Sequence, residues 1–86
     1  MRFEGAVIKE QGITFAVAIV KNRVLQSARE GEDAVMAFSS VFGGIPTILM
    51  AQDSGGTPTY YGRRDLVDFM ASVPLGAVPW TEYQAS

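Results

Sequence analysis

The fold of this chain is decided by residues 13–20, Ile-Thr-Phe-Ala-Val-Ala-Ile-Val, which are apolar on both faces of an extended strand. One face carries the larger Phe15, Val17 and Ile19, whereas the other carries only threonine, alanine and valine. A strand of this kind is usually central in its sheet and covered on both sides. We therefore expect a central strand whose small-residue face admits a closely packed helix or second sheet.

A hairpin is predicted around this strand. Residues 5–8 are a short apolar run, and the polar residues 9–12 separate them from the central strand. Gly12 supplies the positive φ angle that a tight turn requires. The two runs should therefore pair as neighbouring antiparallel strands.

A helix is predicted after the central strand. Ser27 and Glu30 fit a capping box, in which the two side chains bond the free amides of the first turn. Gly31 costs about 1 kcal/mol inside a helix, so the regular helix begins either at Ser27 or near Glu32. Gly43-Gly44 ends it. The apolar stripe of this helix comprises Val35, Phe38, Val41 and Phe42.

The second half of the chain repeats the order strand, strand, helix. Residues 45–51 form an apolar strand, and a glycine-rich turn leads to residues 59–61, which Pro58 confines to a sheet edge. Gly62 breaks this strand, and Pro74 ends the helix that follows. The apolar face of this second helix comprises Leu66, Phe69, Met70 and Val73.

Together these elements predict a single small α+β domain, residues 1–86, in the order ββαββα. We expect a mostly antiparallel or mixed sheet of about four strands with two helices, packed mainly on one face. Residues 75–86 are an apolar, aromatic tail that packs either on its own core or on a neighbouring molecule.

One segment resembles a known fold. Gly44-Ile45-Pro46-Thr47 and the residues that follow, as far as Val73, look like the C-terminal part of the thioredoxin-like fold. The resemblance implies that Pro46 follows a cis peptide bond. The redox cysteines of that family are missing, so it implies at most a redox-inactive adaptor. The chain also looks like short bacterial proteins of unassigned function, which implies no activity.

The composition excludes several chemistries. The 86 residues include no cysteine and no histidine, which rules out disulfides, thiolate zinc sites, cysteine nucleophiles and histidine triads. We expect no metal and no cofactor. A net charge of −2 with scattered basic residues argues against nucleic acid. No apolar stretch approaches the roughly 20 residues that span a bilayer, so we expect no membrane and a cytoplasmic location.

Polar residues gather around the second predicted hairpin. Tyr60, Tyr61, Arg63, Arg64 and Asp53 form a candidate ligand-binding or anion-binding set, with the arginines as the clamp. The alternative is an ordinary solvated turn, because turns favour these residue types for backbone reasons. The sequence identifies no catalytic residue and favours a non-enzymatic role.

The tail offers a candidate interface. Trp80 and Tyr83 are residue types that dominate binding energy at protein interfaces. Apolar residues make up 48% of the chain, a generous share for a domain of this size. We therefore predict an interaction or regulatory module that forms a homodimer or binds another protein. Binding of a small ligand or anion, and a redox-inactive thioredoxin-like adaptor, remain alternatives.

Overall fold

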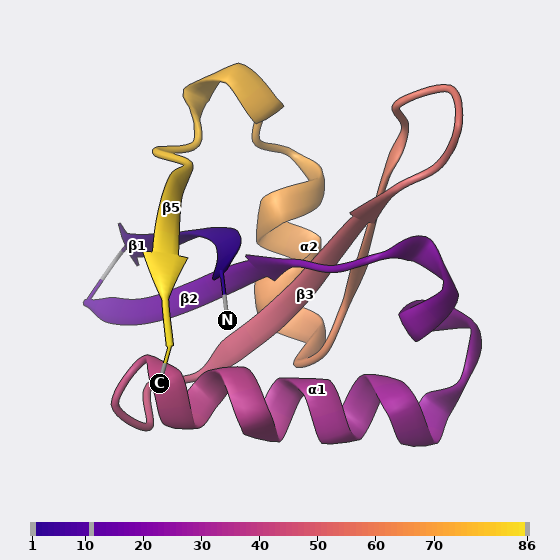
Figure 1. Cartoon of the computed structure of the whole chain (residues 1–86). Coiled ribbons are helices and arrows are strands. Elements are labelled where there is room, and N and C mark those ends of the chain that lie inside the picture. The colour runs from indigo at the N-terminus through magenta and orange to yellow at the C-terminus, as the bar shows by residue number, and fades with distance from the viewer. Residues whose placement is uncertain (1, 11, 86) are drawn as a thin grey trace.

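The computed structural model describes residues 2–10 and 12–85, which form a small α+β domain with two α-helices and a five-stranded mixed sheet (Figure 1). The elements in chain order are β1 (Arg2–Glu10), β2 (Ile13–Ile19), the 3₁₀ helix η1 (Asn22–Gln26), α1 (Ala28–Val41), β3 (Thr47–Gln52), β4 (Pro58–Tyr61), α2 (Arg64–Ala71), the 3₁₀ helix η2 (Leu75–Ala77) and β5 (Thr81–Gln84).

The strand apolar on both faces is central, as expected. The sheet order is β4-β3-β2-β1-β5, in which β2 and β3 run parallel and every other neighbouring pair is antiparallel. The predicted hairpin of β1 and β2 is confirmed, with φ of 81° at Gly12. The expectation of about four strands in the order ββαββα is wrong in one respect, because the tail adds β5. Its sequence, Thr-Glu-Tyr-Gln, has no apolar alternation, and only pairing with Arg2–Gly5 makes it a strand.

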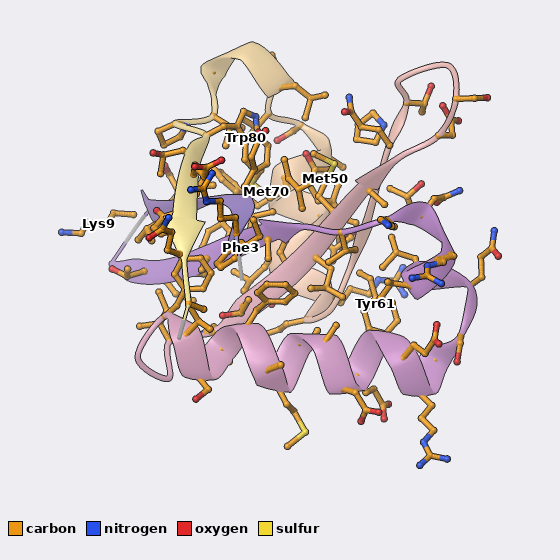
Figure 2. All side chains as sticks on the ribbon, viewed as in Figure 1. Phe3, Lys9, Met50, Tyr61, Met70 and Trp80 are labelled. Atoms are coloured by element: carbon orange, nitrogen blue, oxygen red, sulfur yellow. The ribbon has the colours of Figure 1, made fainter. Side chains whose placement is uncertain are left out.

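The helices cover opposite faces of the sheet, which corrects the expectation that both pack mainly on one face. The stripe of α1, including Phe38 and Phe42, packs with Ala18 and Leu49 on the small-residue face of β2. Leu66 and Met70 of α2 pack on the other face, against a core that includes Phe15, Val17, Ile48 and Met50. Figure 2 shows Phe3 and Tyr61 on the α1 side, with Met50, Met70 and Trp80 on the other. Because β2 and β3 are apolar on both faces, each face needs its own cover.

Helix α1 begins at its predicted cap. The Oγ atom of Ser27 accepts a hydrogen bond of 3.3 Å from the Glu30 amide, and the helix starts at Ala28 rather than near Glu32. Gly31 is therefore inside the helix, where it is buried. A Cβ atom at this position would lie 2.9 Å from Cε1 of Tyr61, so the glycine makes room for that aromatic ring.

The tail packs on its own chain. Nε1 of Trp80 donates a hydrogen bond of 3.1 Å to the Leu75 carbonyl, and the indole joins the core beneath α2. The ring of Tyr83 stacks on Phe3 with centroids 5.5 Å apart, and it makes an edge contact with Phe42. Both aromatic residues therefore have intramolecular partners.

The segment of residues 44–73 differs in one respect from the geometry that its resemblance to the thioredoxin-like fold implies. No peptide bond among the described residues is cis, so the Ile45–Pro46 bond is trans, where the resemblance implies cis. In the same segment the antiparallel pair β3–β4 is followed by α2.

Candidate functional site

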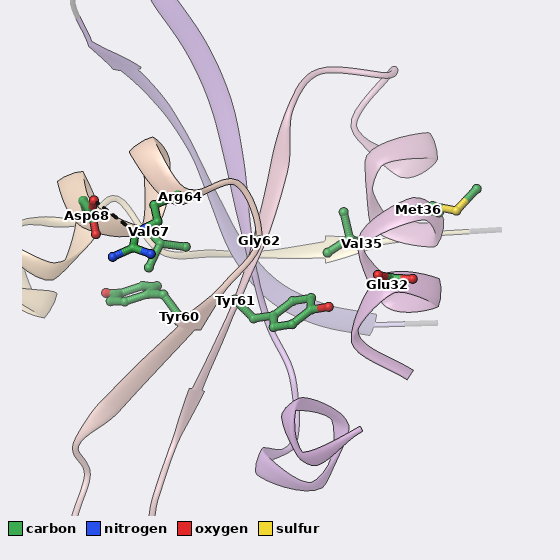
Figure 3. A pocket seen from close by; sticks show the side chains of 9 residues that line it. All are labelled: Glu32, Val35, Met36, Tyr60, Tyr61, Gly62, Arg64, Val67 and Asp68. Atoms are coloured by element: carbon green, nitrogen blue, oxygen red, sulfur yellow. Dashed lines mark ion pairs between the residues drawn. The ribbon is translucent and has the colours of Figure 1, made fainter. Parts of the chain in front are cut away.

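A groove of about 790 Å³ runs along the free edge of β4, between α1 and α2 (Figure 3). We call it the β4 groove. Three parts of the chain line the groove. Helix α1 contributes Glu32, Val35 and Met36, and β4 with the residue after it contributes Tyr60, Tyr61 and Gly62. Helix α2 contributes Arg64, Val67 and Asp68.

Local sequence keeps β4 short and at the edge. The Asp53 carboxylate caps the turn before it, accepting hydrogen bonds from the amides of Gly55 (2.9 Å) and Thr57 (3.0 Å). Pro58 then begins the strand without an amide hydrogen to donate. After Tyr61, Gly62 adopts a φ of 142° and packs against Ile48, where a Cβ atom would come within 2.8 Å. These residues confine β4 to Pro58–Tyr61.

The main chain of Tyr60 faces the groove. The Val20 amide donates to the Met50 carbonyl at 2.9 Å, so the main-chain groups of Met50 point toward β2. Met50 is opposite Tyr60 in the β3–β4 register, and this pair is therefore not hydrogen-bonded. The N–H and C=O of Tyr60 consequently point away from β3, toward the open edge.

The two tyrosine side chains diverge, because neighbouring residues in a strand point to opposite faces. Tyr61 lies toward α1, where its hydroxyl donates to the Ala28 carbonyl at 3.3 Å (Figure 3). Tyr60 lies beside Val67 of α2, and its hydroxyl oxygen is buried with no hydrogen-bond partner among the described residues. Burial raises the pKa of Tyr60 above its ordinary value of 10.0, so this hydroxyl keeps its proton at neutral pH.

The two arginines do not converge on one anion. Nε of Arg63 is 2.8 Å from Oδ1 of Asp65, outside the groove residues. Arg64 borders the groove, and its Nε is 3.9 Å from Oδ2 of Asp68. The side chains of Arg64 and Asp68 are 92% and 70% exposed, so this pair is loose and solvated.

The structure thus brings together Tyr60, Tyr61 and Arg64 of the predicted set. Asp53 and Arg63 are not among the groove residues: the first caps the hairpin turn and the second pairs with Asp65. The contribution of α1 was not predicted. The sequence contains one indication of this contribution, because Met36 is an apolar residue that directly follows Val35 and lies outside the apolar stripe of the helix. In the structure, 73% of Met36 is exposed.

A second, more polar hollow of about 410 Å³ has Arg2, Glu4 and Glu82 in its lining. Glu4 and Glu82 stand directly opposite each other on β1 and β5. Like charges in this position repel, so this end of the sheet is poorly suited to an anionic ligand.

The groove lacks the residue pairs that several kinds of catalysis require. The sequence holds no histidine or cysteine, and the groove shows no nucleophile with an adjacent base. Within residues 2–10 and 12–85, no cluster of three or more acidic side chains is suited to a metal ion. In the same residues, neither helix has the length and hydropathy needed to cross a membrane. No family model, curated protein or solved structure matches this chain in the comparisons made.

Proposed function

We propose that this protein is a non-enzymatic interaction module that acts as a homo-oligomer, with the β4 groove as its association surface. The observation that carries this proposal is a free strand edge bordered by apolar side chains. The main chain of Tyr60 points outward, and Val35, Met36 and Val67 flank it. Unpaired strand edges are templates for pairing with another chain.

The burial and exposure of the apolar side chains also support the β4 groove as the association surface. Phe38 of α1, its C-cap Phe42, and Leu66 and Met70 of α2 pack on the sheet. Met36, at the rim of the groove, is exposed and points away from Tyr60 and Tyr61 (Figure 3). An exposed apolar residue beside an unpaired edge is typical of a contact surface. The predicted cytoplasmic location is part of this proposal.

Analytical ultracentrifugation tests the proposal. Across the micromolar to high-micromolar range, the weight-average mass should rise from that of one chain toward that of two. The transition should be reversible on dilution. A single-chain mass at every concentration would contradict self-association.

A second candidate function is the binding of a small ligand or anion in the same groove. The buried Tyr60 hydroxyl without a partner favours it, because buried polar groups are nearly always hydrogen-bonded. Titration with inorganic phosphate, followed by amide chemical shifts, should perturb Tyr60 and Arg64 in the parent chain and less in the R64Q variant. Equal, weak shifts over the whole surface would reject an anion site.

A further inference from the structure

We infer that the occupant of the β4 groove is the β4 strand of a second copy, added antiparallel and centred on Tyr60, so that one sheet continues through a two-fold axis. The inference rests on the proposed self-association and goes beyond it by naming the edge, the register and the charge pairs of the interface.

The main chain of β4 selects this register. Between Pro58 and Tyr61 the outward-facing residues are Pro58 and Tyr60, and proline has no N–H. When Tyr60 stands opposite Tyr60 of the second copy, each N–H donates to the other carbonyl, which closes a reciprocal pair. A shift of two residues would place Pro58 opposite Tyr60 and lose one bond of each pair. Of these two registers, only the one centred on Tyr60 forms both bonds of each pair, so the edge is complementary to itself there.

The charges on α2 are complementary to themselves in the same arrangement. Arg64, Val67 and Asp68 border the groove at the helical spacing i, i+3, i+4. A two-fold axis beside β4 makes the two α2 helices antiparallel, so Arg64 of each copy faces Asp68 of the other and the Val67 side chains lie between them. Within one chain the two charges are separated by 3.9 Å and mostly exposed, which leaves both available to re-pair.

The other free edge is less suited to self-association. The amide of Ala16 donates to the Pro46 carbonyl, so alternation along β2 and β1 directs the main chain of Glu4 toward β2 and that of its partner Glu82 outward. Pairing of β5 with itself at this residue would bring two Glu82 carboxylates together beside the two Glu4 carboxylates. Like charges opposite each other are destabilising, which favours β4.

A charge-swap experiment tests the interface. The R64D chain should repel its own copy, as should the D68R chain, and the dimer dissociation constant of each should rise by about tenfold or more. An equimolar mixture of the two chains should form a heterodimer, and the double variant R64D/D68R should regain the parent affinity. Both side chains are largely exposed, so the fold tolerates these changes.

A second experiment tests the main-chain bonds. Tyr60→Pro removes the outward N–H, whereas Tyr60→Ala loses the same ring and retains the N–H. We expect Y60P to be monomeric at concentrations where Y60A still dimerises. Glu82→Pro removes the equivalent donor from β5 and should leave the dissociation constant unchanged. If Y60P does not fold, the charge-swap experiment alone tests the proposed interface.

The outcomes separate the two proposals. A parent chain that stays monomeric overturns both the proposed function and this inference. A parent dimer that is unaffected by R64D and D68R, or one that E82P disrupts, overturns this inference and leaves self-association standing.

Discussion

Gly31 has a role that is opposite to the one its helix propensity suggests. Glycine in a helix interior is about 1 kcal/mol less favourable than alanine. Here, however, the missing Cβ atom admits the ring of Tyr61, whose hydroxyl bonds the first turn of α1 through Ala28. The contact ties α1 to β4 and thereby positions one wall of the groove.

Gly31→Ala is expected to destabilise the protein by about 1 kcal/mol, because the new Cβ would lie 2.9 Å from the Tyr61 ring. In a Tyr61→Leu background, which removes the rigid ring, the same change should become neutral or stabilising through its helix propensity. Urea denaturation of the two single variants and the double variant measures this coupling. Equal effects of the Gly31 change in both backgrounds would show that the ring does not impose the glycine.

The raised pKa of Tyr60 leads to a prediction about how stability depends on pH. Because burial raises its pKa in the folded chain, the folded state retains the phenolic proton to higher pH than the unfolded state. This contribution to stability is therefore fully present below pH 10 and is lost as the pH rises through the raised pKa. Tyr60→Phe should show a smaller loss of stability between pH 9 and pH 11 than the parent chain, measured by urea denaturation.

At neutral pH, Tyr60→Phe also tests the unpartnered hydroxyl. Removing a buried hydroxyl that has no partner should leave stability unchanged or raise it by up to about 1 kcal/mol. A clear loss at pH 7 would show that the hydroxyl has a favourable partner in solution.

At the scale of elements, β5 is the largest difference between expectation and structure. The sequence predicts no strand here but an apolar, aromatic tail over residues 75–86, because these residues show no regular period. The pairing of β5 with β1 and the stacking of Tyr83 on Phe3 hold β5 in the sheet. The capping residues of α1, by contrast, are local in sequence, and the helix starts beside the predicted cap Ser27 rather than at the alternative start near Glu32.

Tyr83→Ala should destabilise the fold by about 2 kcal/mol, because it removes the ring contacts with Phe3 and Phe42. Gln84→Ala, an exposed neighbour in the same strand, is the matched control and should have little effect. Thermal unfolding at two protein concentrations distinguishes the source of the loss. A destabilisation that appears only at high concentration would place Tyr83 at an intermolecular contact instead.

At the scale of the whole molecule, the apolar side chains are divided between two cores rather than gathered in one. The sheet separates a core under α1 from a core under α2, and together they contain most of the large apolar side chains. Among the described residues the exposed large apolar side chains are Val7, Met36 and Val41. The 48% apolar composition is thus mostly explained by a sheet covered on both faces, and the proposed association depends on the free edge of β4.

The sequence by itself determined the local features of this protein. Four features depend only on neighbours within a few residues: the apolar faces of residues 13–20, the helix cap at Ser27, the turn at Gly12 and the edge position that Pro58 imposes on its strand. The tertiary structure decided what depends on distant ones: the face that each helix covers, the pairing of β5 with β1, and the joining of Val35 and Met36 to Tyr60 and Arg64 in one groove. An amphipathic stripe shows that a helix must be covered, but the packing of the whole sheet selects the face that covers it.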